Sequence, residues 1–585
     1  MQPKRRTATT TSLAAPIGGW NARDSLANMQ PLDAVQLVNF FPTPTDVTLR
    51  KGYTKYSTDI TGVVETLISY NASNPQKLFA FAEDKIYFAD EGAASVVYSG
   101  LSDSRFQFVS ISNNGGNFIS AVNGLDQPLI YDGTIWYQLA STTTAQTIST
   151  ITHVGAVATL TTSASHGLQT GNKVTISGAT PSDYNGTYVI TRLSATQFEY
   201  TMATTPASNA TVVGSYSVTG ITGVDPATFI NVNLFKNRLY YTQKDTLNVY
   251  YLDVDAISGP ASPILLGGVA RNGGFVQAMG TWTLDAGEGV DDYAVFVTNM
   301  GEVIVYNGTN PSEASTWALK GVWQLGQTFN RRCFFKWSGD LLLLTQDGLV
   351  PLASALQSSR LDPRVNLTDK IFYSVSQAAS QYYDNFGWQI NYFASENMLI
   401  LNVPTDYGTE QYVMHTITKS WARFTGIEAR CFEVHDKAGI FFGSDGFVGQ
   451  YYNGYDDAGS NITATAQQAY SYFNTPGQLK RFTLVRPILQ TVNGTPTVLC
   501  NINVDFETQD ALGQIAFNPS NAGLAQWDVA KWDQGIWGGA LIVSKIWQGV
   551  SGIGFAGSIN INVASSGIEL HWASTDYVME NGGVL

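Results

Sequence analysis

The sequence repeats one local pattern, in which two short apolar segments flank an Asp-Gly or Asn-Gly dipeptide. These dipeptides favour tight β-hairpins because glycine and asparagine adopt positive φ at little cost. They occur at Asp132-Gly133, Asn307-Gly308, Asp347-Gly348 and Asp445-Gly446. The second and third are about 40 residues apart, and the third and fourth about twice 49, which matches the repeat of β-propeller blades. The spacing therefore predicts a mainly-β fold with a β-propeller core, with stacked β-sandwiches as the alternative.

Residues 140–219 interrupt this spacing and differ in composition from their surroundings. They are rich in Thr and Ser and poor in charge, with loose alternation around Ile148 and Ile151 and a strand-like segment from Lys173 to Ile176. Without these residues, of which there are about 80, the first two dipeptides would be about twice 48 residues apart. We therefore expect a small all-β module inserted into a loop of the propeller.

Helical signals are scarce. Leu32, Val35 and Val38 have helical spacing, which predicts a short amphipathic helix over 31–39 that Pro42 ends. A second helix is predicted over 369–384, after Thr368 as a plausible N-cap. Its apolar face should pack into a core and comprises Ile371, Val375, Ala378, Ala379 and Tyr382.

Composition excludes several classes of protein. Of the 585 residues only 13% are charged, about half the usual share, and the net charge is −14. A net charge this negative argues against a protein that binds nucleic acid through a basic face. The three cysteines are far apart and odd in number, which argues against a disulfide framework or a zinc site and for assembly in a reducing cytoplasm. A Thr-rich stretch follows Lys4-Arg5-Arg6 instead of a signal-peptide core, and we expect no membrane span.

A survey for chemistry yields no predicted catalytic, cofactor-binding or metal-binding residue. Gly552 to Gly557 matches GxGxxG, but the β-type segment Ile559 to Val563 follows it where a nucleotide site needs a helix. The five histidines never pair at metal-ligand spacing. Asp456-Asp457 fits a solvated turn better than a calcium loop, because the EF-hand order is missing. A glycosidase pair of carboxylates stays open, since such residues can be far apart in a chain.

Three tryptophans recur every five residues near the end of the chain, at Trp527, Trp532 and Trp537. A period of five fits neither a helix nor a strand. We therefore expect a loop-like segment that large buried rings hold in place. Exposed rings that stack on sugars are the alternative.

A set of short stretches, in order along the chain, carries a resemblance to a known family. They are Gly18-Gly19-Trp20-Asn21 through Asp33-Ala34, Asn39-Phe40-Phe41-Pro42, Arg50-Lys51-Gly52-Tyr53, Leu129-Ile130-Tyr131-Asp132-Gly133, Lys236-Asn237-Arg238-Leu239-Tyr240, Asn402-Val403-Pro404, Trp421-Ala422-Arg423-Phe424, Phe442-Gly443-Ser444-Asp445-Gly446, the Trp527/Trp532/Trp537 cluster and the segment from Tyr577 to Leu585. In this order they resemble the tail nozzle proteins of short-tailed bacteriophages (tail tubular protein B and related tail hub proteins). Residues 140–219 depart from the minimal family pattern.

The resemblance implies a structural virion protein without enzymatic activity or cofactor. Such a protein forms a homohexameric tube below the portal and the head-to-tail adaptor, carries tail fibres, retains the genome until adsorption and then conducts double-stranded DNA. It would be assembled in the bacterial host cytoplasm and reside in the virion tail. The interface candidates are Trp20, Asn21, Trp421, Trp527, Trp532 and Trp537. An acidic lumen would let the phosphate backbone slide without sticking.

The resemblance also implies a platform domain built from the chain ends. The expected domains are an N-terminal clasp of the platform at 1–55, the first propeller hairpins at 56–139, the inserted module at 140–219, the rest of the propeller at 220–480 and a C-terminal β region that completes the platform at 481–585. Two rival functions remain. One is a trimeric tail spike or receptor-binding protein that recognises host surface glycan, and the other is a propeller glycosidase.

Overall fold

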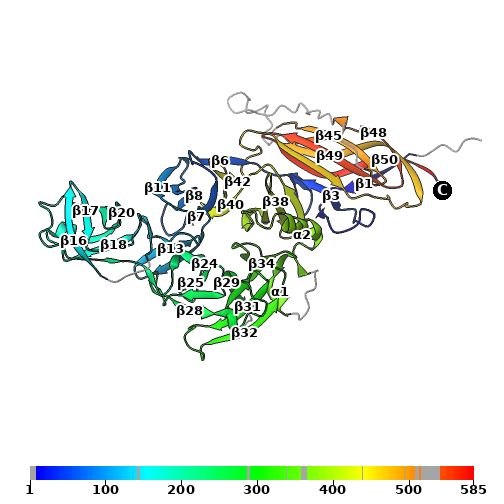
Figure 1. The fold of residues 1–585 in the computed structure, drawn as a ribbon. Helices are drawn as coiled ribbons and strands as arrows, with labels where there is room; N and C mark the ends of the chain where they lie inside the picture. Colours follow the sequence, from blue (N-terminus) through cyan, green and yellow to red (C-terminus); the bar gives the residue numbers. More distant parts are fainter. Residues whose placement is uncertain are drawn as a thin grey trace, which may run out of the picture. The chain divides into compact units, whose positions relative to one another are not determined.

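The structure is a computed structural model that describes residues 8–140, 145–285, 290–337, 339–357, 365–437, 439–492, 494–507, 513–514 and 541–584. The chain divides into two compact units (Figure 1). Unit 1 combines Met1–Tyr56, Pro363–Phe442 and Gly449–Leu585, and unit 2 combines Ser57–Asp362 and Gly443–Val448.

Unit 2 is built from successive small antiparallel sheets. Each sheet is a local meander, because short turns join strands that are neighbours in sequence. The first four sheets have four strands each and the fifth has three. The first sheet comprises β7 (Val64–Tyr70), β8 (Lys77–Ala82), β9 (Lys85–Phe88) and β11 (Ser95–Ser99), and the second comprises β12 (Gln107–Asn113), β13 (Gly116–Val122), β14 (Leu129–Tyr131) and β15 (Trp136–Gln138). The third comprises β24 (Phe229–Phe235), β25 (Arg238–Gln243), β26 (Asn248–Tyr251) and β28 (Ser262–Leu265), and the fourth comprises β29 (Val276–Asp285), β30 (Val290–Thr298), β31 (Glu302–Gly308) and β32 (Trp317–Gln324). The fifth comprises β33 (Phe334–Trp337), β34 (Asp340–Thr345) and β35 (Gly348–Pro351), and α1 (Leu352–Gln357) follows it. Two short pairs join β10 (Gly92–Ala93) to β6 (Tyr53–Thr58) and β23 (Ile221–Thr222) to β27 (Gly259–Pro260).

Consecutive sheets pack face to face through shared apolar layers. Between the first two sheets, the ring of Trp136 meets those of Phe79 and Phe81 edge-on, with centroids 5.3 and 5.4 Å apart. Further layers join the second sheet to the third and the third to the fourth. The inner strands β12, β24, β29 and β34 contact one another in this order. Stacked four-stranded meanders are the architecture of propeller blades, so the predicted mainly-β, propeller-like fold is confirmed.

Two arginines connect the end of this row of sheets with its beginning. Just before β33, Nη2 of Arg332 donates to Thr66 Oγ1 on the first sheet at 3.0 Å. Nη1 of Arg331 donates to the carbonyl of Asn123, after the second sheet, at 2.8 Å. The fifth sheet therefore begins beside the first and second, and the row of sheets in unit 2 curves back on itself as blades around an axis do.

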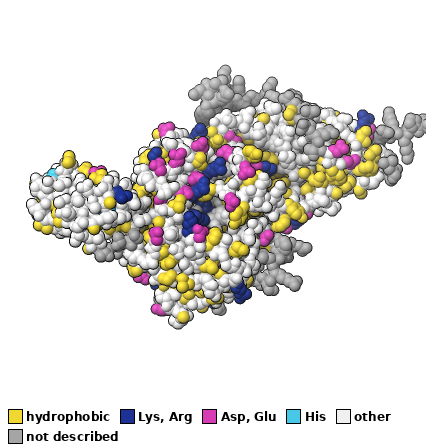
Figure 2. Space-filling model, viewed as in Figure 1, with side chains coloured by type: hydrophobic (Ala, Val, Ile, Leu, Met, Phe, Trp, Pro, Cys, Tyr) yellow, Lys and Arg dark blue, Asp and Glu magenta, His cyan; other side chains and the backbone are white. Residues whose placement is uncertain are grey.

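Residues 146–218 form a sheet of their own with a separate core. Its order is β19-β18-β22-β16-β17-β21-β20. The strands are β16 (Gln146–Val154), β17 (Val157–Thr162), β18 (Lys173–Ser177), β19 (Gly186–Val189), β20 (Thr191–Arg192), β21 (Gln197–Thr201) and β22 (Ser215–Val218). The core comprises residues of this segment and Ala140. On the face drawn in Figure 2 this module shows few charged side chains, which agrees with its Thr-rich composition. The module is therefore a small all-β insertion between the second and third sheets.

We expect the rest of the chain to fold without this module. The two ends of the insertion are adjacent, because the Ala140 carbonyl accepts from the Ile221 N–H at 2.8 Å and the Ala140 N–H donates to the Thr219 carbonyl at 3.1 Å. Replacing residues 141–219 by a short glycine linker should leave a cooperative unfolding transition. The expected loss is about 1–2 kcal/mol, because contacts between the module and the second sheet disappear, among them those of Lys173 with Asp132 and Tyr137 and the hydrogen bond from the Gln138 N–H to the Gly171 carbonyl. Circular dichroism and thermal unfolding measure this, and an aggregated product would contradict it.

Unit 1 contains two large sheets drawn from distant parts of the chain. The ten-stranded sheet comprises β36 (Gln389–Phe393), β37 (Met398–Thr405), β38 (Gly408–His415), β39 (Ser420–Phe424), β3 (Asp33–Val38), β43 (Ile462–Gln468), β49 (Gly557–Ser565), β45 (Thr497–Val504) and β46 (Gly513–Gln514), with β2 (Gly19–Trp20) beside β3. The seven-stranded sheet comprises β4 (Phe40–Pro42), β5 (Val47–Leu49), β50 (Glu569–Val584), β44 (Gln478–Val492) and β47 (Leu541–Ser544), with β1 (Ala8–Ala14) on β50 and β48 (Gln548–Gly554) on β44. A smaller sheet contains β40 (Cys431–His435), β41 (Gly439–Gly443), β42 (Val448–Tyr451) and β6.

The chain ends meet in the seven-stranded sheet. Strand β1 pairs antiparallel with β50 from Ala8 opposite Glu580 to Ala14 opposite Ser574. The buried Gln468 side chain binds this strand, since its Nε2 donates to the Ala14 carbonyl at 2.8 Å. Both ends of the chain therefore belong to one body with the segments around residues 390–470.

The predicted helix over 31–39 is wrong, because Asp33–Val38 is the strand β3. Its backbone pairs with β2, which precedes it in the chain. It also pairs with β39 and β43, whose residues follow more than 380 positions later. Leu32, the first residue of the predicted apolar face, is 41% exposed. Tertiary pairing with distant strands therefore overrides the local helical spacing.

The second predicted helix is confirmed as α2 (Phe372–Gln381), which the 3-10 turn Asp369–Ile371 precedes. Ile371, Val375, Ala378 and Ala379 are buried as expected. The Thr368 side chain makes no capping hydrogen bond, so the prediction of its role as an N-cap side chain is wrong. The GxGxxG segment runs from the end of β48 into β49, and no helix follows it.

Candidate functional site

Three of the six predicted interface residues lie in unit 1, on the strands β2 and β39 and the turn after β2. Trp20 ends β2, Asn21 follows it, and Trp421 lies in β39. Trp527, Trp532 and Trp537 lie outside the described residues. We therefore build the site from the surroundings of Trp20, Asn21 and Trp421.

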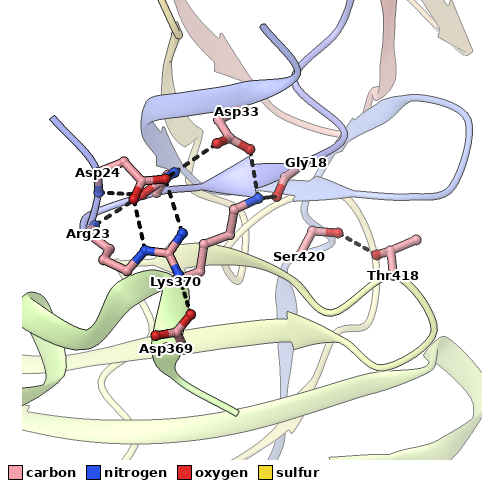
Figure 3. A network of polar contacts seen from close by, with 9 residues as sticks. Gly18, Arg23, Asp24, Asp33, Asp369, Lys370, Thr418 and Ser420 are labelled. Carbon is pink, nitrogen blue, oxygen red and sulfur yellow. Dashed lines mark hydrogen bonds and ion pairs between the residues drawn. The ribbon is translucent and has the colours of Figure 1, made fainter. Parts of the chain in front are cut away.

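Asn21 is the centre of a partly buried polar network formed by Gly18, Asn21, Asp24, Asp33 and Lys370. We reserve the name clasp for this network, of which Gly18, Asp24, Asp33 and Lys370 are labelled in Figure 3. The Nδ2 atom of Asn21 donates to Asp24 Oδ2 at 2.9 Å and to Asp33 Oδ2 at 2.8 Å. Its Oδ1 accepts the backbone N–H groups of Arg23 and Asp24, both at 3.0 Å. Both amide hydrogens and both lone pairs are thus used, which fixes the orientation of the side chain.

Lys370 joins the clasp from the turn before α2. Its Nζ donates to Asp33 Oδ1 at 2.6 Å and to the Gly18 carbonyl at 2.8 Å, and its own carbonyl accepts from the Ala22 N–H at 3.0 Å. Asp33 is 2% exposed, so this ion pair stands in a weakly screened environment. The clasp therefore fixes a segment from the start of the chain against residues about 350 positions later.

Arg23 closes the exposed side of the clasp. It donates from Nε to Asp24 Oδ1 at 2.9 Å and makes a short contact with Asp369. The hydrogen bond from Arg23, followed by that from Asn21, lowers the pKa of Asp24 below its ordinary value. Asp24 therefore stays ionised, as an acceptor for both neighbours.

Trp421 is a core residue of unit 1. It is fully buried, and its indole N–H donates to the Leu367 carbonyl at 3.0 Å. Gly19 passes directly over its backbone with φ +79°, and a Cβ at that position would lie 2.6 Å from the Trp421 carbonyl oxygen. Only glycine fits there, which explains the glycine beside Trp20 in the clasp segment.

Trp20 borders a hollow of about 180 Å³ that we call the Trp20 hollow. The ring of Trp20 meets the ring of Tyr412 edge-on, with centroids 5.3 Å apart. Burial raises the pKa of Tyr412 to about 12, so its phenol remains protonated. The other lining residues are Ser374, Gln377, Ala378, Gln381, Tyr382, Thr405, Glu410 and Arg423.

Arg50 holds a second buried network in unit 1. Its side chain is 0% exposed and forms a two-pronged ion pair with Asp457, with Nη1–Oδ1 at 2.8 Å and Nη2–Oδ2 at 2.7 Å. The remaining N–H groups donate to Asn39 Oδ1 and to the carbonyls of Lys51 and Thr425. All five donors are used. The Asp457 side chain is only 11% exposed, so the second carboxylate of the predicted solvated turn at Asp456-Asp457 is held in an ion pair, while Asp456 accepts from the Gly459 N–H within the turn.

A cavity of about 300 Å³ lies next to Lys51 and His571. Nδ1 of His571 lies 2.8 Å from Asp46 and Nε2 lies 3.1 Å from Glu569. The hydrogen bond with Asp46, opposed by burial and supported by Glu569, raises the pKa of His571. The hydrogen bond from His571 in turn lowers the pKa of Asp46. Lys51 pairs with Glu396 at 2.7 Å, so the charged groups that line this cavity partner one another.

The His571 network predicts a pH dependence of stability. The raised pKa of His571 means that its contribution is complete below about pH 6.5 and is lost as the pH rises through the folded-state value. Asp46 contributes above about pH 3.8 and loses its contribution at lower pH. We therefore expect Asp46→Asn to cost about 1 kcal/mol near pH 5.5 and less near pH 9. Thermal unfolding of both proteins at the two pH values measures this, and equal losses at both would contradict it.

No group of three or more His, Cys, Asp or Glu side chains among the described residues could hold a metal ion. None of their helices is long and apolar enough to cross a membrane. The sequence had singled out Trp20, Asn21 and Trp421. It had not singled out Lys370, Tyr412 or His571, whose partners are separated from them by up to about 525 residues in the chain.

No protein-family model and no curated protein matches the chain. Among solved structures, the chain is similar to the computationally designed Ika8 protein, at 8% identity and a TM-score of 0.32, over 68% of this chain and 99% of that one. It is also similar to the Cps50 (Swd1) β-propeller domain of Myceliophteria thermophila, at 8% identity and a TM-score of 0.28, over 68% and 98%. The third is YCF48 bound to D1 peptide, at 10% identity and a TM-score of 0.25, over 74% and 99%. Likenesses this weak carry no argument about function.

Proposed function

We propose that this chain is a structural protein of a short phage tail, of the tail nozzle type. Six copies would form the tube below the portal and the adaptor, retain the genome and then conduct it. On this proposal unit 1 is the platform that meets the adaptor, the protein resides in the virion tail, and it has no enzymatic activity.

One observation supports the proposal above the others. Stretches that carry the sequence resemblance lie far apart in the chain but touch one another in unit 1. The N–H of Asn39 donates to the Arg423 carbonyl at 2.8 Å, and the Arg50 N–H donates to the Asn39 carbonyl at 3.0 Å. The stretch at Tyr577 pairs with Thr11 at the other end of the chain. A platform domain built from the chain ends requires that these stretches contact one another in one body.

The mass of the assembled protein tests the proposal. We expect native mass spectrometry of the purified full chain to give six copies, or close to six times 63.4 kDa, which is the mass of one chain. Electron microscopy of the same sample should show a ring with a passage wide enough for duplex DNA. A stable trimer, or cleavage of host surface glycan, would overturn the proposal in favour of a tail spike or a glycosidase.

The charge of the passage gives a second test of the same proposal. Each phosphate that a Lys or Arg holds adds salt-sensitive affinity, and many such contacts repeated in six copies would stall a moving duplex. The 46 acidic residues outnumber the 32 basic ones. We therefore expect purified hexamers to bind free duplex DNA weakly at low salt. Tight, salt-sensitive binding would contradict this.

A further inference from the structure

The Trp20 hollow combines aromatic rings with uncharged polar groups. Ser374, Gln377 and Gln381 follow one another on α2 at spacings of three and four, so they share one face of the helix. Gln377 and Gln381 are exposed, and α2 buries its opposite face through Val375 and Ala379. The helix therefore presents a stripe of amides and a hydroxyl to the hollow.

Aromatic side chains form the other part of the wall. Trp20 and Tyr382 are partly exposed, and Tyr412 beneath them is buried in edge contact with Trp20. Rings of this kind supply a flat apolar surface and a polar edge at a low cost in conformational entropy.

The two charged side chains in the lining, Arg423 and Glu410, neutralise each other's charge. Arg423 donates from Nη2 to Glu410 in a short ion pair. Its Nε is buried and has no hydrogen-bond partner among the described residues. Because this Nε is closed to solvent, it offers no hydrogen bond to a ligand in the hollow. The lining thus favours an uncharged ligand with several hydroxyl groups over an ion.

We propose that the Trp20 hollow binds one uncharged sugar ring. A pyranose has an apolar face of C–H groups, which fits against an indole ring, and a rim of hydroxyl groups that both donate and accept. Gln377, Gln381, Ser374 and Thr405 supply donors and acceptors for that rim, and Glu410 supplies acceptors. The volume of about 180 Å³ is below the range of about 300–1,000 Å³ for drug-sized ligands, which limits the ligand to about one ring. This inference does not depend on the proposed tail function.

Saturation-transfer difference NMR on the full-length protein tests the proposal. The probes are glucose, galactose, mannose, rhamnose and N-acetylglucosamine, with glucuronic acid as a charged comparison. We expect signals from at least one uncharged probe. In the double variant Gln377→Ala/Gln381→Ala the affinity for that probe should fall about tenfold, because two hydrogen bonds of about threefold each are lost.

Ser380→Ala is the matched control, since Ser380 is an exposed residue of the same helix outside the lining. It should bind as the unaltered chain does, and all three proteins should share one thermal unfolding midpoint. Trp20→Leu should abolish the contact signals of the sugar C–H protons. The proposal is overturned if no probe gives a signal, if glucuronic acid binds better than every uncharged probe, or if Gln377→Ala/Gln381→Ala leaves the affinity unchanged.

Discussion

Replacing Arg50 by methionine is expected to destabilise unit 1 by about 3–5 kcal/mol, because it leaves the mostly buried Asp457 carboxylate without its cation. The guanidinium also supplies the donors that the Asn39 side chain and two backbone carbonyls accept. Methionine fills a similar volume but offers none of them. Urea unfolding followed by circular dichroism measures the loss as a lower midpoint for the transition of unit 1.

The double variant Arg50→Met/Asp457→Asn separates the charge from the packing. Because it removes both charges, we expect it to recover part of the loss of Arg50→Met. Asp457→Asn alone should be destabilising, since it leaves the buried guanidinium without its carboxylate. A midpoint of Arg50→Met equal to that of the unaltered chain would show that the network contributes nothing to stability.

Replacing Trp421 by alanine is expected to cost about 3–5 kcal/mol, the usual range for removing a large buried ring. The cavity would open beneath Gly19, whose close approach to the Trp421 backbone positions the start of the clasp. We therefore expect the clasp to loosen as well. Limited proteolysis should then cut near residues 18–24 faster than in the unaltered chain.

Trp421→Phe is the matched control for this substitution. It keeps most of the apolar surface but removes the N–H that the Leu367 carbonyl accepts from. We expect an intermediate loss, with proteolysis of the clasp close to that of the unaltered chain. If Trp421→Ala unfolded at the same urea concentration as Trp421→Phe, the ring would contribute little beyond its hydrogen bond.

Local patterns predicted the parts of the fold that local contacts build. Asp132-Gly133 lies between β14 and β15, and Asp445-Gly446 lies in the turn between β41 and β42, as expected. Asn307-Gly308 does not form the turn of its hairpin, because β31 continues through Gly308 and the connection follows it. Three of the four dipeptides thus lie in or beside turns, whereas the interval from Asp347 to Asp445 includes residues 363–442, which belong to unit 1 and not to the row of sheets in unit 2.

The parts that distant segments build were hidden from sequence reasoning. Asp33 and Lys370 meet across more than 330 positions, and neither has a local pattern that points to the other. Tryptophans are conspicuous in a sequence, so Trp20 and Trp421 could be singled out without knowing their neighbours. The Trp20 hollow could not, because Tyr412, Arg423 and the amides of α2 come together only when β2 lies beside β3 and β39.

The pairing of β1 with β50 has a consequence for how the protein is made. Residues 57–362 of unit 2 are nearly continuous in the chain and can fold while synthesis proceeds. Strand β1 of unit 1 lacks its partner until residues 574–580 of β50 have been synthesised, about 560 residues later, which takes about 30–110 s at about 5–20 residues per second. A truncated chain would therefore carry a finished propeller-like body and an unpaired N-terminal strand. We expect proteases and chaperones to recognise that open strand, so that assembly selects for chains that contain β50.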